Sequence, residues 1–325
     1  MSVKSGWHKW SRLVMLGGGV WLLIPGGVLP VVAADSLDEF LSGLETNGVL
    51  VDRLAARAGG VDGILRSIDP EVFISSETTP LTSDRMAGGK VPSVVQAVEL
   101  WPENLAYIKV SGLEPGSGEE LLGHFQSLST RSGLLFDLRG ARGQDLESAC
   151  ILAGLTHHPQ EPLFLITDNR GIPLATNTVA GMFTRLPFLL ILMDEGTSGA
   201  AEALVSVLKG SPGVMLLGGR TRGDPYLRNW LTLPDGRMAR LATRKWKTIL
   251  GESCEKVGVR PDVEVTARSG SGNEGLSRTN KTDRVLSLKS DADRDLMMRV
   301  AGDAALQRAT DILLGLQAVG GYGRE

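Results

Sequence analysis

The spacing of apolar residues predicts two helices before any strand. An amphipathic helix is expected over 36–44, where four apolar residues follow helical spacing: Leu37, Phe40, Leu41 and Leu44. A second helix is predicted over about 51–68. It should end at Asp69-Pro70, because the residue before a proline disfavours helical backbone. Residues 75–100 are polar with little periodicity, and we expect a connection there.

From residue 105 onward, short apolar runs alternate with helical patterns. Strands are predicted at 105–110, 133–139, 163–167, 187–193 and 214–217. Helical patterns separate several of them; one carries Leu121, Leu122, Phe125 and Leu128 on one face, and the next runs through Leu155. Leu233-Pro234-Asp235-Gly236 predicts a hairpin. Strands separated by helices predict an α/β fold, with a mixed sheet covered by helices.

The C-terminal part changes character twice. Residues 267–290 are rich in Ser, Gly, Asn, Arg and Lys, which predicts a flexible linker. Helical spacing then returns and predicts a C-terminal helix that docks back on the core through Leu306, Ala309, Leu313 and Leu316.

The N-terminal 34 residues have the layout of a secretory signal. Lys4, Lys9 and Arg12 precede an apolar run over 13–33, and Val32-Ala33-Ala34 offers small residues for cleavage. An uncleaved membrane anchor is the alternative, but two prolines and five glycines in the run weaken a spanning helix. Cleavage removes three basic residues and no acidic one, so the net charge moves from −3 to −6. We expect a soluble acidic protein, periplasmic or extracellular, with membrane anchoring as the alternative.

Composition narrows the chemistry. No basic block indicates nucleic acid as a partner. Cys150 and Cys254 are the two cysteines, and they could form a disulfide outside the cytoplasm or remain two isolated buried thiols. Because there is no CxxC and no His/Cys cluster, we expect no metal site and no cofactor.

Four segments carry the candidate chemistry. They are DLRGARG at 137–143, DEGTSGAAE at 194–202, GGRTRGD at 218–224, and LPDG at 233–236 followed by GVRPDV at 258–263. In this order they resemble the DLRxNPGG, xxGSASASE, GExTFGKG and LPDG…GIxPDV motifs of the C-terminal processing peptidases, or tail-specific proteases. The resemblance covers about 104–265 and extends loosely to Ile64–Pro70 and the last helix. Fewer than 35 residues separate Pro70 from Leu105, so the family's PDZ insert has no room.

The resemblance implies a crotonase/ClpP-like mixed sheet with an N-terminal helical segment and a C-terminal docking helix. It divides the chain into a signal peptide at 1–34, the helical segment at 35–75, a connection at 76–103, a tail-specific-protease-like core at 104–266, the linker at 267–290 and the C-terminal helix at 291–325. It also implies a serine–lysine dyad and two backbone amides that stabilise the oxyanion.

Carried over residue by residue, the family's three functional side chains are replaced in this sequence. With Glu202 as the anchor, the serine position is Gly199, the lysine position is Asp224 and the glutamine position is Arg228. The oxyanion amides fall at Gly143 and Ala200. Glycine has no atom that attacks a carbonyl, and aspartate is negatively charged. The sequence therefore predicts a catalytically inactive homologue, a pseudoenzyme.

Ser198 is the alternative nucleophile. It is predicted to be the N-cap of the following helix, whereas an active enzyme would need it as a serine shifted by one residue, with a base. His157-His158 and His124 are expected at solvated positions, and three lysines are not placed by the sequence: Lys209, Lys245 and Lys247. Two functions follow: a peptide-binding or adaptor protein that recognises a polypeptide or protein C-terminus, or an active serine endopeptidase that cleaves near C-termini. Acyl-CoA chemistry has only fold-level support.

Two charged groups have both structural and functional interpretations. Asp137 and Arg139, at the end of a buried strand, are predicted to hold the following turn in place. The run 237–247 holds Arg237, Arg240, Arg244, Lys245 and Lys247 between apolar residues. It is either a solvated face of a strand pair or an edge that binds peptide carboxylates.

Overall fold

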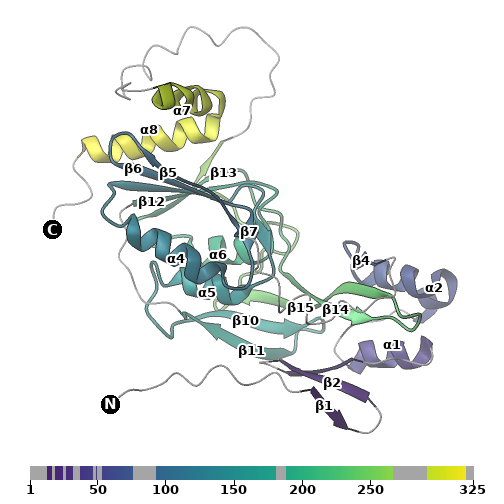
Figure 1. Ribbon diagram of the computed structural model, residues 1–325. Helices are drawn as coiled ribbons and strands as arrows, with labels where there is room; N and C mark the ends of the chain where they lie inside the picture. The colour runs from purple at the N-terminus through teal and green to yellow at the C-terminus, as the bar shows by residue number, and fades with distance from the viewer. Residues whose placement is uncertain are drawn as a thin grey trace, which may run out of the picture. The chain divides into compact units, whose positions relative to one another are not determined.

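The computed structural model describes residues 13–16, 19–24, 27–31, 37–46, 49, 53–75, 93–180, 188–265 and 291–319 (Figure 1). For 13–31, 37–39, 53–59 and 291–293 it describes the backbone alone. Two compact units are present. The first takes its described residues from 1–90, 164–176 and 226–247, and the second from 91–163, 177–225 and 248–325.

The second unit is built on a six-stranded mixed sheet. Its order is β16-β13-β12-β8-β6-β5, and every neighbouring pair is parallel except β5 with β6. The strands are β5 (Val95–Trp101), β6 (Leu105–Val110), β8 (Gly133–Asp137), β12 (Phe188–Met193), β13 (Val214–Gly218) and β16 (Val263–Glu264). All residues of β8 and β12 are buried, as their apolar runs predict for central parallel strands. The predicted α/β fold with a mixed sheet is confirmed.

Helices cover both faces of this sheet (Figure 1). On one side lie α4 (Ser117–Ser127), α5 (Leu146–Ala153) and α6 (Ala200–Leu208). On the other, α8 (Ala304–Ala318) packs Leu306, Ala309 and Leu313 into a cluster with strand residues such as Leu135 and Leu192. The predicted docking of the last helix is confirmed, but α7 (Asp291–Gly302) precedes it. Asp303 separates the two helices because its carboxylate caps α8.

Several edge strands were missed by the predictions from sequence, and two of them have six residues or more. The polar stretch 75–100 contains β5, and β11 (Pro173–Thr178) follows the turn at 168–171. In β5 the exposed positions include Val98 and Leu100, whereas Glu99 is half-buried because it pairs with Arg299 of α7. The usual alternation of apolar and polar residues is therefore reversed in part, and no strand pattern is visible.

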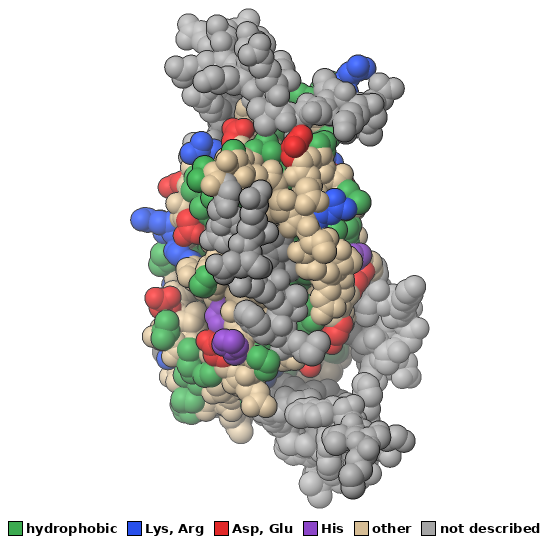
Figure 2. Space-filling model, turned by 90° about the vertical axis from the view of Figure 1, so that its left-hand side faces the viewer, with side chains coloured by type: hydrophobic (Ala, Val, Ile, Leu, Met, Phe, Trp, Pro, Cys, Tyr) green, Lys and Arg blue, Asp and Glu red, His purple; other side chains and the backbone are tan. Residues whose placement is uncertain are grey.

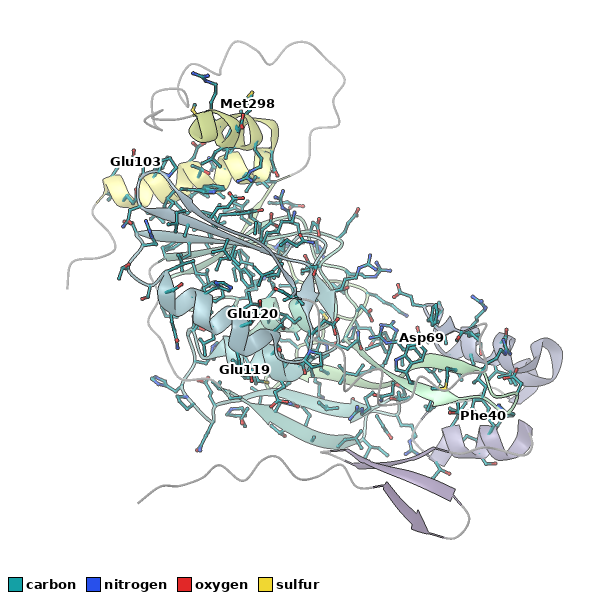
Figure 3. All side chains as sticks on the ribbon, viewed as in Figure 1. Phe40, Asp69, Glu103, Glu119, Glu120 and Met298 are labelled. Atoms are coloured by element: carbon teal, nitrogen blue, oxygen red, sulfur yellow. The ribbon has the colours of Figure 1, made fainter. Side chains whose placement is uncertain are left out.

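The first unit combines a sheet with two helices. The sheet order is β11-β10-β15-β14, with β4 also paired to β15; the further strands are β4 (Phe73–Ile74), β10 (Pro162–Asp168), β14 (Tyr226–Thr232) and β15 (Met238–Thr248). The predicted hairpin is confirmed between β14 and β15. Helices α1 (Leu37–Thr46) and α2 (Arg53–Ile68) are confirmed, with a kink at Gly60. Their apolar side chains, Phe40 among them (Figure 3), pack with Leu233 and Leu241 of the hairpin.

The N-terminal backbone forms a three-stranded antiparallel sheet of β1 (Leu13–Leu16), β2 (Gly19–Ile24) and β3 (Gly27–Val31). Within the described part of the chain, no helix combines the length and the apolar character needed to cross a membrane. Cleavage after residue 34 stays a prediction, and the expected linker at 267–290 lies outside the described residues.

Candidate functional site

The candidate site lies where β8 and β12 end side by side. These strands are parallel neighbours, so the turns that follow them share one edge of the sheet. Asp194 joins the two turns: its Oδ1 accepts from Gly196 N at 2.9 Å and from Gly140 N at 2.8 Å. Thr197 Oγ1 adds a second link by donating to Leu138 O at 2.7 Å. The sequence therefore forms a rigid double turn at this edge.

Gly199 caps α6 in a conformation that favours glycine. Its φ is 62° and its ψ is −127°. A Cβ placed on Gly199 would lie 2.1 Å from Gly143 O and 3.3 Å from Gln144 Nε2. The position of the family's serine thus lacks a hydroxyl, and the volume of its first side-chain atom is occupied by a backbone carbonyl.

Both expected oxyanion residues adjoin Gly199: Gly143 supplies the carbonyl that approaches it, and Ala200 follows it in the chain. Gly143 ends β9 (Arg142–Gly143), which pairs with β7 (Gly112–Leu113). Ala200 is the first residue of α6, and amides in the first turn of a helix have no intrahelical acceptor. The carbonyl of Gly143 faces Gly199, so a hydrogen-bond acceptor lies against the position of the family's nucleophile.

Ser198 is not the N-cap of α6. The N-cap is Gly199, and no side chain caps the helix. Ser198 is 5% exposed, and its amide donates to Ala141 O at 3.0 Å. The predicted capping role is wrong because the helix begins one residue later than a serine cap at 198 requires.

Glu202 connects the turn after β12, which we call the first turn, to the turn at 219–224 after β13, which we call the second turn. It is fully buried on α6, and its Oε1 accepts from Gly223 N at 2.7 Å and from Thr221 Oγ1. Its Oε2 accepts from Asp224 N at 2.8 Å. A further backbone bond joins the turns directly, from Arg222 N to the carbonyl of Thr197 at 3.0 Å. The spacing that anchored the register in the sequence therefore reflects a physical link.

Two carboxylates and a thiol lie close together where these turns meet. Burial raises the pKa of Glu202, and the donors around it act in the opposite direction. Asp224, where the family has lysine, is 9% exposed and lies next to this carboxylate. Burial and the neighbouring Glu202 raise the pKa of the Cys254 thiol.

The candidate bases lie elsewhere or have other partners. Lys209 follows the far end of α6, where its Nζ donates to Arg260 O at 3.0 Å. His157 Nδ1 shares a hydrogen bond of 2.8 Å with Thr156 Oγ1. His124 lies on α4, and His158 follows His157 in the loop after α5.

The remaining predicted residues belong to the first unit. Lys245 and Lys247 lie on β15. Arg228, at the family's glutamine position, pairs through Nε with Asp69 Oδ2 at 2.9 Å (Asp69 is labelled in Figure 3). Asp69 also accepts from Ala242 N at 3.1 Å. Asp69 thus holds the end of α2 to β14 through Arg228 and to β15 through Ala242.

The structural interpretation of Asp137 and Arg139 is confirmed. Arg139 donates to both carboxylate oxygens of Asp137, at 2.9 and 2.7 Å, and the backbone amide of Arg139 binds the same side chain. Tyr107 Oη donates to Asp137 as well. Arg139 Nη1 reaches Asp303 at 2.6 Å, so the pair also holds α8. That last contact has no signal in the sequence.

Metal and ligand features are few at these turns. No group of three or more His, Cys, Asp or Glu residues could hold a metal ion in the part of the chain that the structure describes. A cleft of about 650 Å³ lies between β16 and α8 and is lined by residues such as Glu264, Gln307 and Arg308. On the face shown in Figure 2, acidic and basic side chains are interspersed.

Comparisons with known proteins agree with this geometry. Residues 104–265 match peptidase family S41. The carboxyl-terminal-processing protease of Picosynechococcus is 25% identical over 252 residues, covering 76% of this chain and 60% of the relative. The chloroplastic C-terminal processing peptidase of Tetradesmus obliquus is 24% identical over 76% of this chain and 52% of the relative. The chain therefore spans little more than half the length of these relatives.

A solved structure shows the same fold. A crystal structure described as an S41 protease from Bacteroides fragilis matches with a TM-score of 0.50 at 18% identity, covering 70% of this chain and 59% of that one. Through its residues 104–265, the chain belongs to peptidase family S41, the family of the C-terminal processing peptidases.

Proposed function

We propose that this chain is a catalytically inactive S41 domain that binds a polypeptide outside the cytoplasm, as a receptor or adaptor for protein C-termini. The observation that carries the proposal is the position of Gly143 O, 2.1 Å from the site of a Cβ on Gly199. Peptide hydrolysis by this family's chemistry needs a serine oxygen at that place, and a carbonyl occupies the space.

The missing base supports the same conclusion. A serine nucleophile needs a neighbouring group that takes its proton. Asp224, at the family's lysine position, and Glu202, which accepts from the Asp224 amide, are both acids. Two carboxylates in a buried site cannot supply the positive charge that favours an oxyanion. Replacement of both the serine and the lysine argues against a single substitution in an otherwise working site.

The double turn itself has been kept, which favours binding over loss of all function. Asp194, Thr197 and Glu202 hold the turns together with buried hydrogen bonds. Small residues line the turn, and they allow another backbone to approach closely. The polypeptide ligand and its C-terminus come from the names of the relatives, and the location outside the cytoplasm rests on the apolar N-terminal 34 residues.

A fluorophosphonate probe tests the absence of catalysis. The purified chain, its Ser198→Ala variant and an active C-terminal processing protease are treated in parallel. We expect labelling of the active protease alone. Labelling of the chain that disappears in Ser198→Ala would establish the alternative, an endopeptidase with a shifted nucleophile.

Binding is tested with immobilised peptides that end in a free carboxylate. Retention of the unlabelled chain supports a receptor or adaptor. Absence of retention for a broad set of such peptides would contradict the binding function even if the chain is inactive.

A further inference from the structure

Three buried polar atoms without a hydrogen-bond partner gather in the first unit. Among the described residues, the buried side-chain nitrogen and oxygen atoms that lack a partner are Asn169 Oδ1, Arg244 Nε and Trp246 Nε1. Asn169 directly follows β10, and the other two residues lie on its sheet neighbour β15. Buried polar groups are normally paired, so a cluster of exceptions on adjacent strands needs an explanation.

Arg244 differs from three other arginines of this unit. Arg170, Arg228 and Arg237 each pair with an aspartate, at distances of 2.6 to 2.9 Å. Arg244 has no carboxylate partner among the described residues, and its one recorded contact is a long 3.5 Å hydrogen bond from Nη2 to Asn229 Oδ1. Burial lowers the pKa of Arg244, the direction expected of a cation without an anion.

The carboxylates nearest in the fold already have other partners. Asp69 accepts from Arg228 and from the amide of Ala242, two residues before Arg244. Asp168, next to Asn169, accepts from Arg170 Nε at 2.9 Å and from two backbone amides. An internal rearrangement that pairs Arg244 would therefore leave another arginine unpaired.

A β-bulge on β15 lies beside Asn169 and directly precedes Arg244. Leu227 pairs with Arg244 and Arg228 pairs with Ala242, so Thr243 is an extra residue on β15. Asn169 Nδ2 donates to Ala242 O at 3.0 Å, which holds its amide group beside the bulge with Oδ1 unpaired. Arg244 and Trp246 are two residues apart after the bulge and so project from the same face of β15.

We propose that Arg244, Trp246 and Asn169 form a binding site for the C-terminal residue of a polypeptide. The α-carboxylate accepts from Arg244 Nε and Trp246 Nε1, and the last peptide N–H donates to Asn169 Oδ1. Two free donors and one free acceptor match a carboxylate with an amide beside it, whereas an acidic side chain offers the carboxylate alone. The choice of a polypeptide as ligand rests on the proposed function.

Three small probes separate these chemistries: N-acetylalanine, N-acetylalaninamide and acetate. The readout is the indole N–H signal of Trp246 in the ¹⁵N-labelled chain, assigned with Trp246→Phe. We expect N-acetylalanine to shift this signal with at least about 10-fold higher affinity than acetate, and the amide to have no effect. Equal affinity for acetate would overturn the assignment to a C-terminus, and equal affinity for the amide would overturn the carboxylate site.

Substitutions on β15 test the role of Arg244. Arg244→Gln should weaken N-acetylalanine binding by about 10- to 100-fold, and Arg244→Lys should retain part of the affinity. Arg240→Gln is the matched control. Arg240 lies on the same strand before the bulge, and in the sheet register it is opposite Phe73 of β4 and Trp230 of β14. Binding unchanged in folded Arg244→Gln or Arg244→Lys overturns the inference.

Stability separates a ligand-binding arginine from a structural one. Burying a charge without a partner costs free energy, and an apolar residue of similar size avoids that cost. Arg244→Met should therefore unfold at the same or a higher temperature than the parent chain without ligand. A lower melting temperature would mean that Arg244 holds the fold together, and this would overturn the proposal.

Failure of this carboxylate site can be distinguished from failure of the proposed function. Fluorophosphonate labelling at Ser198 would contradict the inactive assignment, while the Trp246 signal would still report on the carboxylate site. Conversely, an unlabelled chain that binds peptides equally well with Arg244→Gln would leave the proposed function standing and refute this site.

Discussion

The carbonyl oxygen of Gly143 lies 2.1 Å from the position of a Cβ on Gly199. This relationship changes what the loss of the family serine means. A lost hydroxyl could be restored by one substitution if the backbone still left room for a side chain. Here the backbone has closed that space, and the φ of 62° at Gly199 adds a further cost to any other residue.

Gly199→Ser, alone or combined with Asp224→Lys, should therefore fail to restore hydrolysis. The serine side chain requires a shift of Gly143 and leaves a residue with a Cβ at positive φ, so we expect a loss of about 1–3 kcal/mol of unfolding free energy. Urea denaturation and a peptide hydrolysis assay measure the two effects.

Gly210→Ser is the matched control for this prediction. Gly210 also has a positive φ, 77°, and a Cβ there would meet nothing within 4 Å. Its cost should be limited to about 1 kcal/mol of backbone strain. Equal losses for the two variants, or recovered activity in the double variant, would contradict the closed site.

Glu202→Gln should loosen the second turn. Both carboxylate oxygens of Glu202 accept from donors, so an amide nitrogen in either place would face an N–H or O–H group. We expect a loss of about 2–4 kcal/mol and faster amide exchange at Gly223 and Asp224. Glu147→Gln is the control, because Glu147 also lies in the first turn of a helix but is exposed. It should change stability by less than about 0.5 kcal/mol.

The sequence predicted the centre of the sheet better than its edges. In β8 and β12 every position is buried, so a continuous apolar run is sufficient evidence. In β5 the half-buried Glu99 depends on Arg299, 200 residues later. A local pattern contains no information about such a partner. For this reason an apparently featureless connection proved to be an edge strand.

The site shows the same limit. The motif register identified Gly199, Asp224 and Glu202, because spacing along the chain survives substitution. It did not identify the direction of the Gly143 carbonyl, which depends on the backbone of a turn 56 residues away. Nor did it reveal that Glu202 is fully buried with its donors on a separate turn. These features come from packing between distant segments.

Asp303→Ala should release the C-terminal helix. Asp303 accepts from Ala305 N and Leu306 N at the start of α8 and pairs with Arg139 Nη1 at 2.6 Å. Loss of both roles should cost about 1–3 kcal/mol. Chemical denaturation measures the total, and hydrogen exchange across 304–318 shows whether the loss is local.

The lowered pKa of Asp303 sets the direction in which the stability of the protein changes with pH. Burial opposes ionisation of Asp303, but Arg139 and the two amides outweigh it and hold the pKa below its usual 3.8. A lowered pKa contributes stability above the unfolded value that is lost as pH falls through the folded value. Asp303→Ala should therefore weaken the pH dependence below about pH 4. Asp311→Ala is the control on the same helix: burial raises the pKa of Asp311, so its removal should not destabilise.

Cys150 and Cys254 should behave as two unreactive thiols. Both are unpaired and buried, at 2% and 7% exposure, which favours isolated residues over the disulfide that the sequence also allowed. Burial raises the pKa of Cys150 to about 12, and burial with the nearby Glu202 also raises that of Cys254. Because the thiolate is the reactive species, neither should react with Ellman's reagent at neutral pH in the folded chain.

Two thiols should react in concentrated guanidinium. None reacting there until a reductant is added would establish a disulfide and refute the prediction. Fast reaction of the folded chain that persists in Cys254→Ser would place a reactive thiolate at Cys150, against its burial on α5.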